Sequence, residues 1–593
     1  MKQLLSGNEA IARGAWEAGV KMAAAYPGTP STEILETVAM RHREIYAQWS
    51  PNEKVAYEVG IGASLGGART LVTMKHVGVN VAADPFMTHA YTGVNGGFVL
   101  VSADDPEMHS SQNEQDNRYF AKFANVPMFE PSDSNESLEM MKAAYDVSEE
   151  FDAPVLFRVT TRISHSKGVC EVGDRVEVEQ VKFEKNPQKY VMVPGNARGR
   201  HVVVRERLEK LKEYSETCPW NVVENNGSKV GVITGGVSYQ YCKEVAPDFD
   251  YLKLGFTFPL PMKKIEEFIK AHDTIIVVEE LEPYYEEQIR AAGFMVEGKK
   301  FTGHRGELSP FRVATAFKDA GLIDEVAQAE IEQEPGMFPR PPVLCPGCPH
   351  RGMFMALKKL KIAVTGDIGC YTLGMLKPLD ALDTCICMGA SIGNAIGMDR
   401  VDGSKKGTVA VIGDSTFLHS GVTGLMDAVY NKSNVTTIIL DNRVTAMTGG
   451  QEHPSTGQTL MGDPAGTVDF PTLCKALGVN SVVAVDPYDY DACLNAVKQE
   501  MAKDEPSVII TDRPCVLMPK RIMADPYEVD LDECNGCSAC FRISCPAIAA
   551  AVETNEHGHP KAIIDPTLCT GCTLCSQICP EEAIHLKPKP VKA

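Results

Sequence analysis

The sequence predicts an α/β protein built from parallel sheets, followed by a small cysteine-rich α+β module. Over most of the chain, helical patterns alternate with short β-branched runs, which is typical of parallel α/β layers. Two neighbouring strand patterns end in polar residues, at Asp414 and at Asn442. Eight closely spaced cysteines lie between positions 534 and 579. These three observations predict a multidomain redox protein.

The composition limits the kind of partner. The chain has 593 residues, enough for roughly four domains of ~150 residues. The formal net charge of −20 argues against nucleic acid or an anionic membrane as partner. No run of eighteen apolar residues and no signal-peptide core is present. Nineteen cysteines in such a chain indicate metal ligands and reduced thiols, so we expect a cytoplasmic protein.

The first block covers residues 1–170. A helix is expected from about Asn8 to Ala18, and AAAYPGTPSTE then reads as a strand-to-helix turn. Further strands are expected in RTLVTM, GGFVLVSADDP and APVLFRV. Residues 171–226 are charged and lack a strand rhythm. We expect them to be a linker with one exposed helix, at RERLEKLKEYSE.

Two more α/β blocks follow. The second, 227–335, contains the strand patterns VGVITGG and DTIIVVEE. A proline-rich stretch at 335–342 marks a boundary. The third block covers 340–523, and the cysteine-rich module covers 524–593. Because the first and third blocks are both α/β, they are candidates for related halves of one site.

The third block carries a candidate magnesium and phosphate site. A buried strand pattern ends in Gly413-Asp414-Ser415, and VTTIILDN ends 28 residues later at Asn442. The carboxyl ends of adjacent parallel strands share an edge, where such sheets bind ligands. Oxygen ligands from Asp414 and Asn442 suit Mg²⁺. Gly413 allows close approach of a phosphate, and the helix after Ser415 attracts the anion. A Rossmann-type nucleotide site, or plain strand-end polarity, is the alternative.

The cysteine-rich module predicts two [4Fe–4S] clusters. Its two runs, each ending in Cys-Pro, are Cys534-x2-Cys537-x2-Cys540-x4-Cys545 and Cys569-x2-Cys572-x2-Cys575-x3-Cys579. In doubled runs of this kind the fourth cysteine binds the other cluster. We therefore pair Cys579 with the first three cysteines and Cys545 with Cys569, Cys572 and Cys575. Structural zinc is the alternative. The extra residue before Cys545 predicts a bulged loop.

The first block resembles the pyrimidine-binding domain of 2-oxoacid:ferredoxin oxidoreductases. The resemblance rests on YPGTP at 26–30 and on the spacing from Glu53 to Gly62-Ala63. It implies that Glu53 activates thiamine diphosphate and that Thr29 contacts the substrate. Lys75-His76 falls at the expected mouth of the site, which makes His76 a further candidate. Without the resemblance, Glu53 reads as a solvated helix-start residue and His76 as a structural one.

The third block resembles the magnesium–thiamine diphosphate motif of thiamine enzymes. That resemblance implies the backbone carbonyl of Val444 as a third protein ligand, beside Asp414 and Asn442. Ser415 stands where such motifs often carry glycine, a mild departure from the pattern.

The order of the domains resembles one branch of the family. Together with CPGCPHRG, GDSTFLHSG and LDNRVTAMTGGQEHP, it is similar to the large (alpha) chains of indolepyruvate:ferredoxin oxidoreductases. The resemblance implies a transketolase-C-like domain at 227–335, a smaller beta subunit as partner and an external ferredoxin. It also implies oxidative decarboxylation of an aryl 2-oxoacid, with CoA as acyl acceptor.

Four further cysteines are candidates for a third cluster. Related enzymes hold a cluster near thiamine with a CxxC pair, a downstream cysteine and a late cysteine. Cys345, Cys348, Cys370 and Cys515 fit that order. The alternative is a structural or redox pair at 345 and 348, with Cys370 and Cys515 as core residues, since cysteine is often buried.

Two other functions stay open at this stage. The first is a ferredoxin oxidoreductase for another 2-oxoacid, such as pyruvate, 2-oxoglutarate or a branched-chain acid. The second is a non-catalytic electron-transfer subunit. Glu53, Asp414 and Asn442 together argue against the second, because a scaffold needs none of them.

Overall fold

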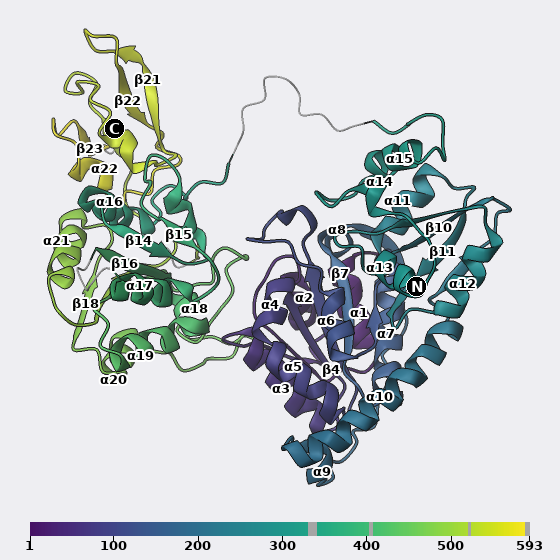
Figure 1. The fold of residues 1–593 in the computed structure, drawn as a ribbon. Coiled ribbons are helices and arrows are strands. Elements are labelled where there is room, and N and C mark those ends of the chain that lie inside the picture. The colour runs from purple at the N-terminus through teal and green to yellow at the C-terminus, as the bar shows by residue number, and fades with distance from the viewer. Residues whose placement is uncertain (330–340, 402–406, 520–522, 588–593) are drawn as a thin grey trace. The chain divides into compact units, whose positions relative to one another are not determined.

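The chain folds into two compact units, residues 1–335 and 336–593 (Figure 1). The computed structural model describes residues 1–329, 341–401, 407–519 and 523–587. The proline-rich boundary predicted at 335–342 lies largely outside the described residues. Each unit is described separately below.

The first unit is built around a seven-stranded sheet. Six strands are parallel, and the seventh, β12, is antiparallel at one edge. β12 comes from the second sequence block, so the first two blocks share a sheet. In spatial order the strands are β12 (Phe256–Phe258), β6 (Met128–Phe129), β7 (Val155–Thr160), β5 (Phe98–Asp104), β4 (Thr70–Lys75), β2 (Met22–Ala25) and β3 (Tyr46–Trp49).

Helices pack around this sheet. α1 packs against α2 and α7, and α3 packs against α5. A short antiparallel pair, β1 (Lys2–Ser6) with β8 (Lys167–Glu171), closes the domain. The helices are α1 (Gly7–Glu17), α2 (Thr32–Arg41), α3 (Glu53–Leu65), α4 (His76–Val81), α5 (Ala83–Thr92), α6 (Arg118–Ala124), α7 (Ser134–Glu150) and α8 (Thr161–His165).

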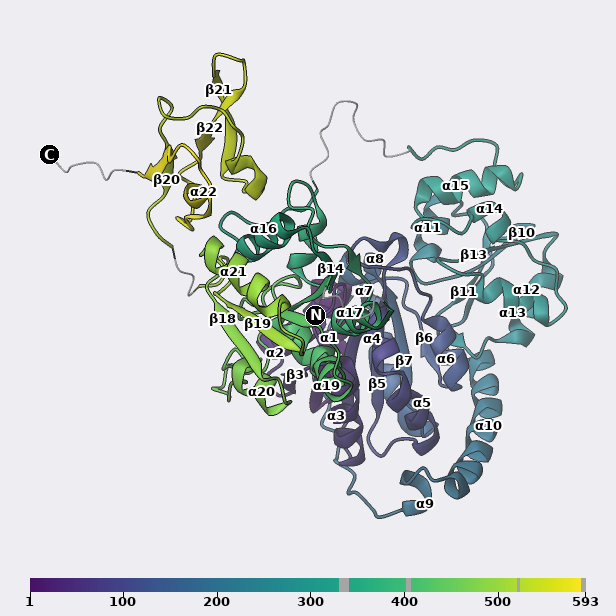
Figure 2. The ribbon, with the colours of Figure 1, turned by 60° about the vertical axis from the view of Figure 1, so that its left-hand side comes forward.

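The stretch expected as a linker is largely packed structure. It holds α9 (Pro187–Tyr190), the long α10 (Pro194–Thr217) and β9 (Val222–Glu224). α10 contains the expected helix and contacts α5 and β12. Figure 2 shows it as one long helix that begins near α9. Leu208 of α10 lies in the main hydrophobic core of the unit. The high charge of this stretch suggested a linker, because only a narrow face of α10 is buried and the rest of the helix is polar.

The second sheet of the first unit has four strands. Its order is β13 (Thr274–Val278), β10 (Val230–Gly235), β11 (Asp250–Leu254) and β9, with only β9 antiparallel to its neighbour. Ile233 and Leu252 join the same core as Val72 and Leu100 of the larger sheet. The accompanying helices are α11 (Val237–Val245), α12 (Met262–Ala271), α13 (Tyr284–Ala291), α14 (Lys299–Thr302) and α15 (Pro310–Asp319).

The second unit contains a six-stranded, fully parallel sheet. Successive residues of its central strand face different cores, since side chains alternate along a strand. Val409 and Val411 pack with α16 and α21, whereas Ala410 and Ile412 pack with α17 and α19. The elements are β15 (Thr384–Cys385), β14 (Ala363–Gly366), β16 (Thr408–Gly413), β17 (Thr436–Asp441), β19 (Ser507–Asp512), β18 (Ser481–Val485), α16 (His350–Leu360), α17 (Ala390–Val401), α19 (Val422–Tyr430), α20 (Phe470–Ala476) and α21 (Tyr490–Met501).

The cysteine-rich module completes the second unit. It consists of two antiparallel strand pairs and one short helix, which gives the predicted α+β character. Its core includes Cys540, Ile543, Leu574 and Cys575, and Met355 of α16 packs against it. The elements are β20 (Tyr527–Val529), β23 (Ile584–Leu586), β21 (Ile548–Thr554), β22 (Pro560–Ile564) and α22 (Leu574–Gln577).

None of the helices in the described part of the chain combines the length and the apolar character that a bilayer crossing requires.

Candidate active site and cluster sites

Asp414 stands at the carboxyl edge of the parallel sheet, directly after β16. Its side chain is 3% exposed. Oδ1 accepts a hydrogen bond from the backbone N–H of Ser415 at 2.8 Å, and Oδ2 lies 3.2 Å from Nε2 of His453. Burial alone would raise the pKa of Asp414, but these partners lower it. The group is therefore held as a carboxylate, the form that binds a cation.

A second acid lies beside it at the end of β17. Burial and the negative charge of Asp414 raise the pKa of Asp441 to about 7. The next residue, Asn442, is buried and donates from Nδ2 to Nε2 of His350 at 3.4 Å. The pKa of His350 is lowered to about 4 by burial, while Asp414 opposes that shift. Asn442 thus contacts His350, and the charge of Asp414 acts on the same histidine. A cation shared by Asp414 and Asn442 stays a prediction.

The neighbouring loops are tied to each other. Thr445 donates to the hydroxyl of Ser415 at 2.8 Å, and Val444 is buried. Asp414 begins a helical stretch of α18 (Asp414–Thr416), a π-turn at Phe417–Gly421 and then α19. Such π-turns inside helices are frequent at functional sites.

Gly413 has a packing role in the structure. A β-carbon there would lie 2.7 Å from Cε1 of Tyr371, so the tyrosine ring occupies that space. Close approach of a phosphate at Gly413 stays a prediction.

Sequence reasoning missed several polar groups at this edge. His350, Asp441 and His453 are described above. Asp367, which follows β14, is fully buried and accepts from the backbone N–H groups of Gly389 and Ser391 at 2.8 and 3.1 Å. The site was predicted from only two strand ends of the third block. Asp367 follows a third strand, β14, and considering every strand end would have found it. His350 and His453 lie on a helix and in a loop, and no periodicity marks them.

Four thiols gather next to Asp414. Burial, and then the charges of Cys515 and Cys345, raise the pKa of Cys370 to about 11. The charges of Cys345 and Cys370 likewise act on Cys348, and the charge of Asp414 acts on Cys515. These thiols are thus near enough to influence one another, and the backbone N–H of Cys515 donates to the carbonyl of Asn442 at 3.0 Å. A cluster shared by all four stays a prediction.

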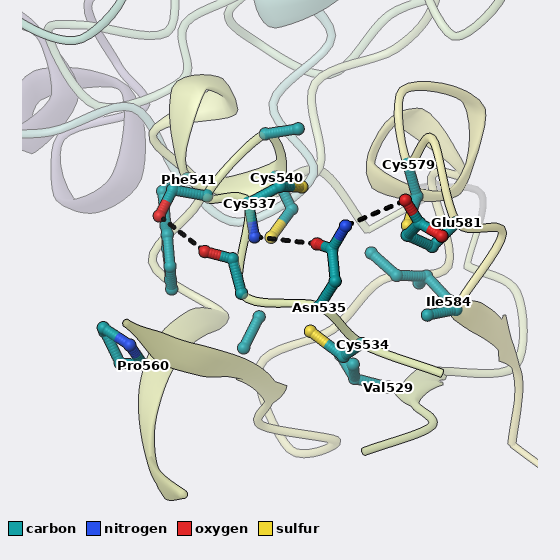
Figure 3. Close-up of a pocket in the computed structure, with 15 residues that line it drawn as sticks. Val529, Cys534, Asn535, Cys537, Cys540, Phe541, Pro560, Cys579, Glu581 and Ile584 are labelled. Carbon is teal, nitrogen blue, oxygen red and sulfur yellow. Dashed lines mark hydrogen bonds between the residues drawn. The ribbon is translucent and has the colours of Figure 1, made fainter. Parts of the chain in front are cut away.

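The eight cysteines of the module form the two groups of four that the crossed pairing predicts. Figure 3 shows one pocket lined by Cys534, Cys537, Cys540 and Cys579. A second pocket is lined by Cys545, Cys569, Cys572 and Cys575. Burial, together with the charges of Cys534, Cys537 and Cys579, raises the pKa of Cys540 to about 11. Burial and the charges of Cys545 and Cys569 likewise raise the pKa of Cys572 to about 11. In a bound cluster, iron would take the place of the thiol protons.

The extra residue before Cys545 is accommodated as predicted by an irregular loop. A 3-10 turn spans Cys540–Ile543, and Ser544 follows with a left-handed φ of 58°. The second run has α22 at the equivalent place.

The two pockets differ in their surroundings. The pocket of Cys569 is also lined by Gly347 and Arg351, which belong to the CPGC loop and to α16. The pocket of Cys534 is lined by residues of the module alone. The Cys569 site therefore adjoins the loop that carries Cys345 and Cys348, and we call it the inner site. The Cys534 site is the outer site. Within the described residues, no three His, Cys, Asp or Glu side chains converge on one point suited to a single metal ion.

The candidate catalytic residues of the first unit meet at the carboxyl edge of its larger sheet. Glu53, 5% exposed, begins α3, and Asn52 caps that helix by accepting from the N–H of Val55 at 2.9 Å. A β-carbon at Gly78 would lie 2.7 Å from Cγ of Glu53. Glycine at this position of α4 therefore makes room for the carboxylate.

Thr29 and His76 lie on adjacent strand ends. Thr29 is half-buried and follows β2. A β-carbon on its neighbour Gly28 would lie 3.1 Å from Cβ of Lys75, the last residue of β4. The buried Lys75 donates to the carbonyl of Ser110 at 2.5 Å, and burial lowers its pKa to about 8.

His76 is fully buried. Its Nε2 lies 3.2 Å from the carbonyl oxygen of Asn113, and burial followed by the charge of Lys75 lowers its pKa to about 4. In these contacts it supports the loop after β5, which favours the structural interpretation of this residue.

Curated proteins related to this chain match it almost from end to end. It is 42% identical to indolepyruvate oxidoreductase subunit IorA of Thermococcus kodakarensis, over 98% of this chain and 96% of that protein. The chain belongs to the IorA family. IorA of Archaeoglobus fulgidus is 41% identical over 100% and 98% of the two chains, and IorA of Methanothermobacter marburgensis is 40% identical over 99% and 97%. The resemblance seen in the sequence is confirmed.

Three family models match parts of this IorA-family chain. The thiamine-diphosphate-binding model of pyruvate flavodoxin/ferredoxin oxidoreductases covers 13–217, and so includes Glu53 and α10. The C-terminal thiamine pyrophosphate-binding model covers 367–511, from Asp367 past His453. The 4Fe-4S binding model covers 562–585. Thiamine diphosphate and iron–sulfur clusters are the cofactors of this IorA-family fold.

Proposed function

We propose that this chain is the catalytic large subunit of an enzyme that oxidatively decarboxylates an aryl 2-oxoacid such as indolepyruvate. CoA is the acyl acceptor, and an external ferredoxin takes the electrons. One observation carries the proposal beyond the family match: the Asp414 site adjoins four thiols, and these adjoin the inner site of the module. A cofactor site for decarboxylation thus lies at the start of a continuous series of cluster sites.

The residues present fit thiamine diphosphate and magnesium. Asp414 is held ionised, Asn442 offers an amide oxygen, and the Val444 carbonyl is the third protein ligand to Mg²⁺. When bound, thiamine diphosphate supplies the electron sink for decarboxylation. Glu53 would lie beside the aminopyrimidine ring of the bound cofactor and donate a hydrogen bond to its N1′ nitrogen. Thr29 orients the carboxylate or keto group of the substrate.

The thiols define the electron route. Cys345, Cys348, Cys370 and Cys515 would hold a third [4Fe–4S] cluster. Clusters at the inner and outer sites would then supply one-electron carriers between it and ferredoxin. Iron analysis of the purified complex should give about twelve iron atoms per large chain, at about four per cluster. Replacing Cys370 by Ala should remove about four of them. A wild-type content of about eight contradicts the third cluster.

The substrate, the acyl acceptor and the partner are tested together. We expect a smaller beta subunit to be required, and we place the complex in the cytoplasm, where thiols stay reduced. Co-expressed chains should reduce ferredoxin with indolepyruvate or phenylpyruvate, in a reaction that depends on CoA and thiamine diphosphate. Preference for pyruvate would assign another 2-oxoacid. If the purified complex reduces ferredoxin but contains no thiamine diphosphate, the chain is an electron-transfer subunit.

A further inference from the structure

Arg351 is a buried cation without a carboxylate partner. It lies in α16 and is 0% exposed. All its hydrogen bonds go to main-chain carbonyls: Nη1 donates to Ile543 at 2.8 Å and to Ser544 at 2.5 Å, and the other guanidinium nitrogens donate to Leu344 and Cys345. Across the described residues, no acidic side chain lies within ion-pair distance of it.

Buried arginines of the first unit are held in two ways. Arg207, like Arg351, donates to main-chain carbonyls, those of Asp152 and Ala90. Arg118 and Arg158 of the first unit are as deeply buried, and each binds two carboxylates at 2.5 to 2.9 Å. Burying a charge is costly unless an opposite charge compensates it. Carbonyl dipoles satisfy the N–H groups of Arg351, but they supply no net negative charge.

The missing negative charge lies on the thiols around it. Arg351 lines the inner site. Its Nη2 also donates to the carbonyl of Cys345, a member of the four-thiol group, at 3.1 Å. The guanidinium therefore lies beside both sites, where a positive charge stabilises thiolates.

The extra residue of the first cysteine run contributes to this arrangement. The 3-10 turn Cys540–Ile543 and the left-handed Ser544 present two successive carbonyls to Nη1 of Arg351. On the other side, Gly347 approaches the second run so closely that a β-carbon there would lie 1.8 Å from Oγ1 of Thr570. The loops of both sites are thus fixed around one cation.

We propose that Arg351 is the counter-cation of the inner [4Fe–4S] cluster and raises its reduction potential, which makes it the first acceptor in the module. The proposal rests on the cluster assignment above but not on the substrate. One electron enters the inner cluster from the four-thiol site, with no bond formed or broken and no proton moved. Reduction adds a negative charge, which a nearby cation stabilises. Arg351 is a positioning residue and touches no substrate.

The test is a potentiometric titration of the assembled complex, followed by electron paramagnetic resonance, with mediators and no 2-oxoacid. Arg351→Gln keeps two donors for the carbonyls and removes the charge. We expect one cluster of the module to become harder to reduce by about tenfold in its equilibrium constant, or about 59 mV for one electron. Arg351→Lys should stay near the wild-type potential. Arg542→Gln, an exposed cation in the same 3-10 turn, is the matched control and should change nothing.

An unchanged potential in an iron-replete Arg351→Gln complex would overturn the proposal and make Arg351 a structural contact. If Arg351→Gln loses iron from the inner site, Arg351→Lys decides. If Arg351→Lys retains its iron and its potential, the charge is what matters, because lysine lacks the planar guanidinium that reaches four carbonyls. Loss of iron in both variants contradicts it. A wild-type complex without iron at the inner site would instead refute the cluster assignment itself.

Discussion

At the residue scale, the most informative position in the first unit is a glycine and not the carboxylate beside it. Gly78 leaves space for Glu53, and a β-carbon would lie 2.7 Å from Cγ and 2.8 Å from Oε1 of that side chain. The position of the Glu53 carboxylate thus depends on the absence of a β-carbon at Gly78 of α4. No pattern in the sequence links positions 53 and 78.

Gly78→Ala therefore tests Glu53 without replacing it. The added methyl displaces the carboxylate, and a misplacement of about 1 Å is expected to lower substrate-dependent dye reduction by about 10²-fold. Iron absorbance should stay at the wild-type level. Gly62→Ala, on the same helix as Glu53 but with open space around it, is the control. Equal activity of both variants with wild type would remove Glu53 from the catalytic role, and Glu53→Gln gives the lower limit of activity.

At the residue scale, the positions of Asp414 and Asn442 were predictable because parallel strands place their carboxyl ends on one edge. Their role as ligands stays a prediction. The crossed grouping of cysteines followed from the doubled ferredoxin-type runs, in which the fourth cysteine binds the other cluster. His350, His453 and Arg351 escaped because their roles depend on contacts between segments far apart in the chain.

At the element scale, short loops decide whether the CPGC loop and the cysteine-rich module of the second unit fit together. Gly347 in the CPGC turn has a φ of +65°, which favours glycine, and it also contacts Thr570 directly. The hydroxyl of Tyr488 donates to the carbonyl of Gly347, which holds the turn from the other side. The turn is thus constrained by its conformation and by its neighbour.

Gly347→Ala should lower the iron content of the purified chain, because its methyl would overlap Oγ1 of Thr570. Thr570→Gly in the same chain should restore part of the iron, since Oγ1 and Cβ are the atoms in the way and Oγ1 is a buried atom without a hydrogen-bond partner in the described structure. Gly558→Ala tests backbone strain without steric overlap. Gly558 lies in the cysteine-rich module, has a φ of +77° and has open space around it. We expect the Gly558→Ala chain to keep its iron. Failure of Thr570→Gly to restore any iron would attribute the loss to backbone strain.

Elements were predictable from sequence where hydrophobic periodicity was strong. The strands at RTLVTM, VGVITGG and VTTIILDN form where their patterns place them, as β4, β10 and β17. β12 was not predictable, because three residues carry no periodicity and its pairing with β6 joins two sequence blocks. α10 looked like a solvated helix, since its buried residues are few and include Arg207.

At the scale of the whole molecule, the first unit is held together by a buried ion network. It links the two sheets through the acids Asp104, Asp116, Glu130, Glu279 and Glu280 and the cations Arg118, Arg158 and Lys299. Acids outnumber cations by two (five against three). Burial accordingly raises the pKa of Asp104, Glu279 and Glu280 to about 7 each, although the cations oppose the shift.

This network predicts a pH dependence of unfolding. An acid with a raised pKa in the folded state holds a proton that the unfolded chain has already lost, so its stabilisation declines as the pH rises from about 4 through about 7. Glu280→Gln mimics the protonated acid at every pH. We therefore expect the free energy of unfolding of this variant, relative to wild type, to increase between pH 5 and pH 8.

The chain offers a clean measurement of that difference. All three tryptophans, Trp16, Trp49 and Trp220, lie in the first unit, so their fluorescence in urea reports its unfolding separately from that of the iron–sulfur module. Glu282→Gln, an exposed neighbour of Glu280, is the control and should show no pH-dependent difference. Parallel curves for Glu280→Gln and wild type from pH 5 to pH 8 would mean that Glu280 is ionised throughout, and that the excess acid is neutralised elsewhere in the network.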